Sequence, residues 1–306
     1  MFSWYLTYLH PVTSGKNMEE RLADQFERLN KTPLEYLKGV ENFYNAYCEV
    51  LKKQDRHAHL LSYLASDFWR IILCTSILHN YSQSEIETLK ELLVKFYYQN
   101  WVAEQKEPKK QTNCNIINAL KEKKNIDDII SIVKQYLDEN KITQNFREKL
   151  KDDHLYEKHK KASKNSWVKP ILILVEYFMS DDANPTYIKM DDDLHVEHIL
   201  PQKPTLSSQW AKDFSEEERE RYTHSLANLT LLGGKKNTQA SNLDFKDKKE
   251  IYMGEEIKLN KKKTFRVMTC YDTTKDIVHR YTEWTPKNLE KRKEELIEII
   301  ESVLTL

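Results

Sequence analysis

Glycine is nearly absent from the middle of this chain: five occur among 306 residues, and none lies between positions 39 and 233. Folds that bind dinucleotides or nucleoside triphosphates need clustered glycines where backbone N–H groups approach a phosphate. Neither the G-x-G-x-x-G pattern nor the G-x-x-x-x-G-K-S/T pattern is present. The sequence therefore excludes both classes, and it disfavours architectures of many strands, which use glycine in their turns.

Residues 17–180 carry apolar side chains at helical spacing. These side chains recur every three or four positions from Leu34 to Leu51, and further helices are predicted over residues 59–78 and 126–139. Ser82 and Glu85 form a capping-box pattern ahead of another apolar run. We expect these apolar stripes to pack together as a helical core, so the predicted fold class is mainly α.

The character of the sequence changes after Asn184-Pro185. Two short β-like runs, Leu194–Leu200 and Asn228–Leu232, enclose an acidic helical stretch, and a lysine-rich helical stretch follows the second run. We therefore predict two domains. A helical linker or interaction domain covers residues 1–185, and a second domain covers residues 186–306.

The charges of the second predicted domain are unevenly distributed. Lysine and arginine together number 48, as do aspartate and glutamate, so the formal net charge of the chain is zero. Residues 191–220 nevertheless carry nine acidic and three basic side chains, whereas residues 221–266 carry 11 basic and five acidic side chains. A basic segment of this kind suits contact with a DNA backbone. The alternative is a solvated helix face with pairs of opposite charge.

The sequence gives no sign of a membrane segment. Its longest apolar run, Ile171 to Met179, is interrupted by Glu176 and is far shorter than the roughly 18 residues that indicate a membrane span. The first residues lack the positively charged stretch and the small-residue cleavage site of a signal peptide. We expect a cytoplasmic protein that does not contact a membrane.

One segment, H-V-E-H-I-L-P-Q at residues 195–202, places a carboxylate beside an imidazole at the end of a predicted strand. Strand alternation sends Glu197 and His198 to opposite faces, so their joint use requires a twisted strand end. A hairpin followed by a helix can bring both close to Asn237 around one divalent cation. Carboxylate and amide oxygens suit Mg²⁺ or Mn²⁺, and a neutral imidazole can take a proton from water.

Several separated blocks occur here in one order: H-V-E-H-I-L-P-Q, Trp210, H-S-L-A-N-L-T-L-L, K-K-N, S-N, Phe245, Lys248-Lys249 and Tyr252. Together they closely resemble the HNH (His-Me finger) nuclease domain at the C-terminus of GmrSD-type proteins. These proteins are modification-dependent, type IV restriction enzymes, with relatives among other phage-defence nucleases. The closing W-T-P-K-N-L-E-K-R-K-E-E-L, with Trp284 and Arg292, is similar to the terminal helix of that family. The resemblance covers about residues 190–306.

The resemblance implies a ββα-metal finger embedded in helices, which follows the N-terminal helical domain. By its motif, His198 is similar to the general base, and Asn228 to the residue that orients this base through the backbone. Glu197 and Asn237 stand at the positions of the metal ligands, for Mg²⁺ or Mn²⁺. The alternatives are that His198 is a buried structural histidine, that Glu197 does not touch the metal, and that the asparagines only form turns and caps.

Other residues of the region are expected to support the site or to bind DNA. The expected supporting residues are His195, Gln202, His224 and Asn242. The expected DNA-binding residues are Lys235, Lys236, Lys246 and Lys249. The Cys-x-x-Cys pairs of many HNH nucleases are missing, so we expect core packing to hold the finger together.

These features predict a metal-dependent HNH DNA endonuclease or nickase of an antiviral, modification-dependent restriction system. The alternatives are a non-catalytic module that binds DNA or protein in a defence complex, and an RNA-directed nuclease. Relatives carry a nucleotide-hydrolysing sensor domain with a D-G-Q-Q-R-like motif, which does not occur in this sequence. We expect the sensor to lie in a longer form of the chain or on a partner subunit.

Overall fold

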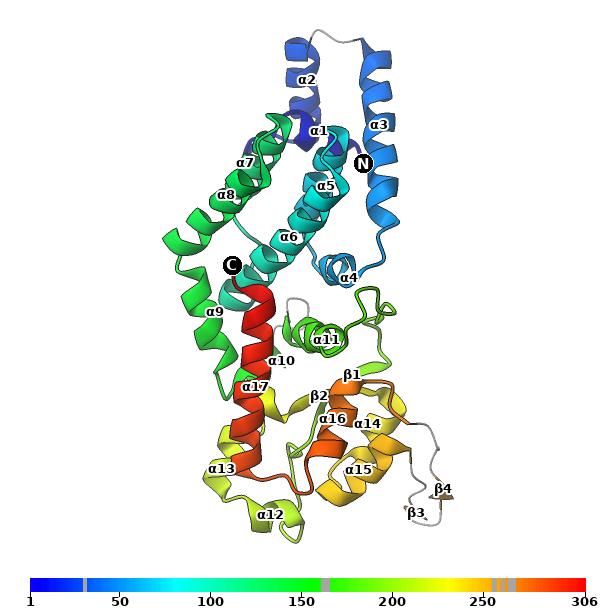
Figure 1. Ribbon diagram of the computed structural model, residues 1–306, viewed down its shortest axis with the longest axis vertical. Helices are drawn as coiled ribbons and strands as arrows, with labels where there is room; N and C mark the ends of the chain where they lie inside the picture. Colours follow the sequence, from blue (N-terminus) through cyan, green and yellow to red (C-terminus); the bar gives the residue numbers. More distant parts are fainter. Residues whose placement is uncertain (30–31, 161–165, 255–257, 260–261, 264–267) are drawn as a thin grey trace. The chain divides into compact units, whose positions relative to one another are not determined.

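The computed structural model describes residues 1–29, 32–160, 166–254, 258–259, 262–263 and 268–306 (Figure 1). The chain divides into two compact units, the first of Met1–Thr143 with Leu304–Leu306 and the second of Gln144–Val303. The boundary predicted near residue 185 lies inside the second unit, and as a boundary between functional domains it stays a prediction. No helix within the described residues is long and apolar enough to cross a membrane.

The first unit is built of helices. Its elements are α1 (Phe2–Leu9), α2 (Met18–Leu29), α3 (Pro33–Leu51), α4 (Arg56–Ser62), α5 (Phe68–Leu78), α6 (Gln83–Glu104), α7 (Lys110–Lys121), α8 (Ile126–Glu139) and the first residues of α9 (Ile142–Leu150). The capping box is confirmed, because the Glu85 N–H donates to Ser82 Oγ and the Ser82 N–H donates to Glu85 Oε2. The single helix predicted over residues 59–78 is wrong: α4 ends, and Ser66 Oγ accepts the Phe68 N–H as α5 begins.

The second unit combines helices with a small sheet, which confirms a mainly α fold containing a ββα element. Its helices are the greater part of α9, α10 (Leu155–Lys160), α11 (Val168–Phe178), α12 (Gln209–Asp213), α13 (Glu216–Tyr222), η1 (Leu226–Asn228), α14 (Gly234–Ala240), α15 (Phe245–Met253), α16 (Asp272–Arg280) and α17 (Pro286–Leu304). Its strands are β1 (Leu194–His198), β2 (Leu229–Gly233), β3 (Lys258–Leu259) and β4 (Lys262–Lys263). The strands pair as β1 with β2 and β3 with β4, both antiparallel.

The ββα element consists of β1, β2 and α14. The strands pair so that His198 lies opposite Leu229 and Leu194 opposite Gly233, and α14 begins at the next residue. The Gly234 N–H donates to the Asp193 carbonyl at 2.8 Å. A Cβ atom at Gly234 would lie 3.1 Å from His195 Nε2, so a glycine here allows the helix to start close to β1.

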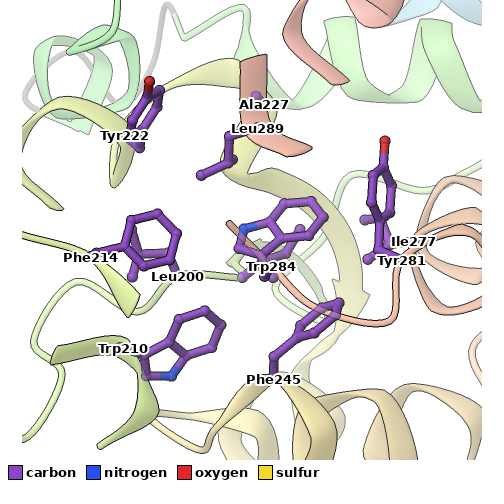
Figure 2. Close-up of a cluster of buried hydrophobic side chains, with 11 residues drawn as sticks. Leu200, Trp210, Phe214, Tyr222, Ala227, Phe245, Ile277, Tyr281, Trp284 and Leu289 are labelled. Atoms are coloured by element: carbon purple, nitrogen blue, oxygen red, sulfur yellow. The ribbon is translucent and has the colours of Figure 1, made fainter. Parts of the chain in front are cut away.

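An aromatic core joins the elements around this sheet (Figure 2). Trp284, just before α17, lies in the middle of the cluster, with ring centroids 5.4 Å from Phe245 of α15 and 5.2 Å from Tyr281. Trp210 of α12 donates from Nε1 to the Leu243 carbonyl at 2.9 Å. Because these rings are buried, the core fixes α12, α15 and α17 against the residues that follow β1.

Helix α16 is held against β2 by buried polar contacts. The Glu176 carboxylate of α11 accepts the backbone N–H groups of Asp272 and Thr273 at 2.6 and 2.9 Å, at the start of α16. Burial raises the pKa of Glu176. Within α16, the Thr274 hydroxyl donates to the Leu231 carbonyl at 2.6 Å. Helix α16, whose first N–H groups are capped by Glu176, therefore supports the middle of β2.

Candidate active site

His198 is the last residue of β1, and only 6% of its surface is exposed. Its ring lies nearly perpendicular to two others, with centroid distances of 4.4 Å to Tyr156 and 5.5 Å to His224. The Tyr156 and His224 rings are parallel to each other, 6.0 Å apart, and the Tyr156 N–H donates to the His224 carbonyl. These contacts restrict the orientation of the His198 imidazole.

Gln202 contacts the imidazole from the loop that follows β1. Its side-chain amide lies 3.3 Å from His198 Nδ1, measured from Nε2. The oxygen and nitrogen of a glutamine amide exchange places by rotation. With the amide nitrogen toward Nδ1, as placed, Gln202 donates to an unprotonated Nδ1; with the amide turned over, its oxygen instead accepts the Nδ1 proton and Nε2 of the imidazole is the basic nitrogen. The supporting role expected for Gln202 stays a prediction.

Asn228 fixes the backbone immediately after His198. Its carbonyl oxygen accepts the Ile199 N–H at 3.0 Å, and its side chain accepts the Leu200 N–H at 2.7 Å and donates to the Leu200 carbonyl at 2.9 Å. The same side chain donates to the Thr223 carbonyl and accepts from Trp284 Nε1. Asn228 is completely buried. It therefore holds the end of β1 in place without contacting the imidazole itself.

Helix α17 completes this support. Arg292 is 4% exposed, and its guanidinium donates to the carbonyl oxygens of Ala227 and Leu229, on either side of Asn228. Burial lowers the pKa of Arg292 to about 10, so it remains protonated at neutral pH. Trp284 and Arg292 thus act on the same segment, which explains physically why the terminal helix belongs to the site.

Glu197 lies in a buried cluster with two side chains of α15. Lys248 Nζ donates to Glu197 Oε1 at 2.7 Å, and the Tyr252 hydroxyl donates to the same oxygen at 2.8 Å. Lys248 Nζ also donates to the His198 carbonyl oxygen at 2.7 Å. Burial lowers the pKa of Lys248 and raises the pKa of Tyr252. The Glu197 carboxylate is therefore already engaged by an ion pair.

The part of the chain that contains these contacts matches a known protein family. Residues 140–299 match the C-terminal domain of GmrSD restriction endonucleases, and this stretch is more than half of the chain. The chain belongs to the GmrSD C-terminal domain family. A search among curated proteins finds no match. The matched stretch contains the whole ββα element, α10 with Tyr156, and the part of α17 that carries Arg292.

The remaining predicted site residues of this GmrSD-type domain lie on separate elements and loops. Asn237 lies in the middle of α14 and is partly exposed. The His195 ring is next to Gly234 at the start of α14. Asn242 is exposed and donates from Nδ2 to the Lys203 carbonyl at 2.9 Å. His224 contacts the His198 ring, as described above. The roles expected for these residues stay predictions.

The lysines expected to bind DNA divide into two groups. Lys235 and Lys246 are exposed. Lys236 donates to the Ile251 carbonyl, and Lys249 donates to the Tyr281 carbonyl at 2.7 Å. Burial also lowers the pKa of Lys236. The side chains at residues 255–267, which carry much of the positive charge counted in the sequence, lie outside the described part of the structure.

The possible ligands for a metal ion are few. Within the described residues, no three His, Cys, Asp or Glu side chains gather as ligands for a metal. An ammonium 2.7 Å from Glu197 Oε1 repels a second cation. Asn237, by contrast, presents a partly exposed amide. Mg²⁺ keeps several of its waters and is usually held by one or two carboxylates together with substrate phosphates, so an ion next to Asn237 would take further oxygen ligands from water and from the substrate.

Sequence reasoning did not assign roles to Tyr156, Lys248 or Tyr252. A signal for two of them was present: Phe245, Lys248 and Tyr252 are spaced three and four residues apart, which places them on one face of a helix. Phe245 and Tyr252 mark that face as buried, so a lysine between them indicates a buried charge that needs a partner. Nothing in the local sequence of α10 indicates that Tyr156 lies against His198.

Proposed function

We propose that the second unit hydrolyses phosphodiester bonds of DNA as an HNH endonuclease or nickase, with His198 as the general base. Membership of a restriction endonuclease family supports the nuclease activity and DNA as its substrate. The observation that carries the assignment to His198 is the support of this residue at the end of β1. Asn228 holds the backbone beyond it, and Tyr156, His224 and Gln202 surround its ring.

In the proposed reaction, His198 takes a proton from the water that attacks the scissile phosphate. We assign the proton transfer to Nε2 of the imidazole, with the amide oxygen of Gln202 turned toward Nδ1. The two neighbouring rings prevent the imidazole from turning away. Asn228 acts through the backbone, because its side-chain amide is fully engaged by main-chain atoms and Trp284, and Arg292 donates from Nη1 to two main-chain carbonyls.

The proposed cofactor is one divalent cation, Mg²⁺ or Mn²⁺, with Asn237 as a protein ligand. When bound, the cation supplies positive charge next to the phosphate, where negative charge develops during hydrolysis. The assignment of Glu197 as a second ligand stays a prediction from the sequence, and its ion pair with Lys248 supports a different role.

The activity can be tested with the purified chain, supercoiled plasmid and either Mg²⁺ or Mn²⁺. We expect conversion to open circles or linear DNA, and the ratio of these products distinguishes a nickase from an enzyme that cuts both strands. Gel-shift binding of the plasmid without any cleavage under several divalent metals would favour the non-catalytic binding module. Cleavage of structured RNA in preference to plasmid would favour the RNA-directed nuclease.

A contribution of Lys246 to DNA binding is a separate prediction. Lys246 is exposed at the start of α15, whereas Lys249 of the same helix donates to a carbonyl. Each lysine that neutralises a phosphate contributes about 0.9 to the slope of log K against log salt concentration. We expect Lys246→Ala to reduce the magnitude of that slope by about 0.9, as measured by fluorescence anisotropy. Lys249→Ala serves as the comparison and should change the slope less.

We also propose that this domain works in a modification-dependent antiviral system. The proposal follows from the family, whose members are restriction endonucleases. The nucleotide-hydrolysing sensor would act from a longer form of the chain or from a partner subunit. Co-purification of the chain with its partners from the host cells, followed by plasmid cleavage with and without nucleoside triphosphate, tests this arrangement. Cleavage that is equally fast with and without the nucleotide would contradict a nucleotide-dependent sensor.

A further inference from the structure

Lys248 has no role in the reaction proposed above, although it contacts the residue proposed as general base. It lies on α15, its side chain is 0% exposed, and it is 50 residues away in sequence from His198. A buried ammonium is costly unless opposite charge and hydrogen-bond acceptors surround it. Here both are supplied by two consecutive residues of β1, Glu197 through its carboxylate and His198 through its main-chain carbonyl.

We propose that Lys248 is a positioning residue for the general base, and that Glu197 is the counter-ion that keeps this lysine in place. This role rests on the proposed function of His198. Lys248 fixes the carbonyl of His198 itself, while Asn228 fixes the N–H groups of the next two residues. The main chain immediately after the Cα that carries the imidazole is thus held by two different elements, α15 through Lys248 and η1 through Asn228.

Tyr252 supports the counter-ion rather than the base. It lies one helical turn after Lys248 and donates to the same oxygen of Glu197, but it does not share the contact with the His198 carbonyl. The two residues can therefore be separated by mutation. Loss of Tyr252 leaves the contact between Lys248 and His198 intact, whereas loss of Lys248 removes it.

Lys248→Met alone leaves the Glu197 carboxylate buried without its cation, and the variant can fail to fold for that reason. The double variant Lys248→Met/Glu197→Gln removes both charges and nearly preserves the shape of the cluster. We expect it to have a higher Tm than Lys248→Met. A double variant no more stable than Lys248→Met would overturn the role of Glu197 as counter-ion.

The positioning role predicts a specific defect in the folded double variant. We expect kcat for plasmid cleavage to fall by about 10- to 100-fold because the base is misplaced, with little change in KM. Tyr252→Phe should reduce kcat far less. Lys90→Met removes another completely buried lysine, which pairs with Asp55 and Glu87 in the first unit; it should lower Tm without lowering kcat.

Nitrogen-15 NMR of the histidine side chains provides a readout that does not depend on cleavage. The His198 signals are identified by their loss in His198→Ala. In the double variant we expect them to shift or to split into several signals, and in Tyr252→Phe we expect them to stay near their wild-type positions. Unchanged His198 signals in the double variant would overturn the inference, even if the wild-type chain cleaves nothing and the proposed function itself is wrong. Where the wild type does cleave, an unchanged kcat in the double variant would overturn it as well.

Discussion

His198→Ala is expected to slow phosphodiester cleavage by about 10²- to 10⁴-fold, the contribution typical of a general base. The imidazole is the group that takes the proton, and alanine has no basic atom to replace it. Asn228, Lys248 and Arg292 contact the backbone around this position rather than the imidazole. The substitution therefore removes none of their hydrogen-bond partners, and we expect the variant to fold. Affinity for DNA should therefore remain close to that of the wild type.

The measurement is the single-turnover rate of plasmid nicking, with DNA affinity followed in parallel by gel shift. His279→Ala is a matched control, because His279 is an exposed histidine on α16 of the same unit; it should cleave at the wild-type rate. If His198→Ala retains full activity with Mg²⁺ or Mn²⁺, the assignment of the general base is wrong. If both variants lose activity equally, the cause lies in the folding of the unit.

The sequence predicted the local elements of the site more reliably than their contacts. Residues 195–202 and 228–237 contain the strand, turn and helix signals of the ββα element, because these depend on neighbouring residues. The family resemblance then supplied roles for His198 and Asn228. The ion pair between Glu197 and Lys248 joins positions 51 residues apart, and no local pattern specifies which distant lysine a buried carboxylate will meet.

The charge of the lysine-rich segment illustrates the same limit. Counted along the sequence, residues 221–266 appear as a basic surface. In the structure, Lys248 is buried with Glu197, and Lys236 and Lys249 donate to main-chain carbonyls. These lysines stabilise the packing of α14 and α15 around the sheet. A count of charges therefore overstates the positive charge that the described residues offer to DNA.

The interruption between α4 and α5 has a simpler cause. Apolar residues continue at helical spacing through this region, which is why one helix was predicted over residues 59–78. Ser66 competes with a continuous helix, because short polar side chains bond to the backbone N–H groups at a helix start. Ser66 Oγ accepts the Phe68 N–H, and the second helix begins there. Periodicity locates apolar faces, whereas capping residues determine where a helix ends.

The second large effect is expected for Asn228→Ala, which should lower the free energy of unfolding of the second unit by about 4 kcal/mol or more. The substitution removes the partner of the Leu200 N–H and carbonyl, the Thr223 carbonyl and Trp284 Nε1. Each buried polar group left without a partner costs about 1–3 kcal/mol. The alanine side chain has no polar atom that could replace these hydrogen bonds. Because Asn228 is completely buried, bulk water does not reach these groups either.

Urea unfolding followed by tryptophan fluorescence measures this loss, because Trp284 contacts Asn228 directly. Asn242→Ala is the matched control: Asn242 is exposed and bonds to one main-chain carbonyl, so its loss should cost less than about 1 kcal/mol.

Asn228→Asp tests the donor and acceptor groups of the side-chain amide separately. It keeps an acceptor for the Leu200 N–H and Trp284 but turns a carboxylate oxygen toward two carbonyl oxygens, so it should also destabilise the unit. An Asn228→Asp protein as stable as the wild type would show that the donor half of the amide contributes nothing, and that the Asn228 side chain holds Leu200 by its acceptor half alone.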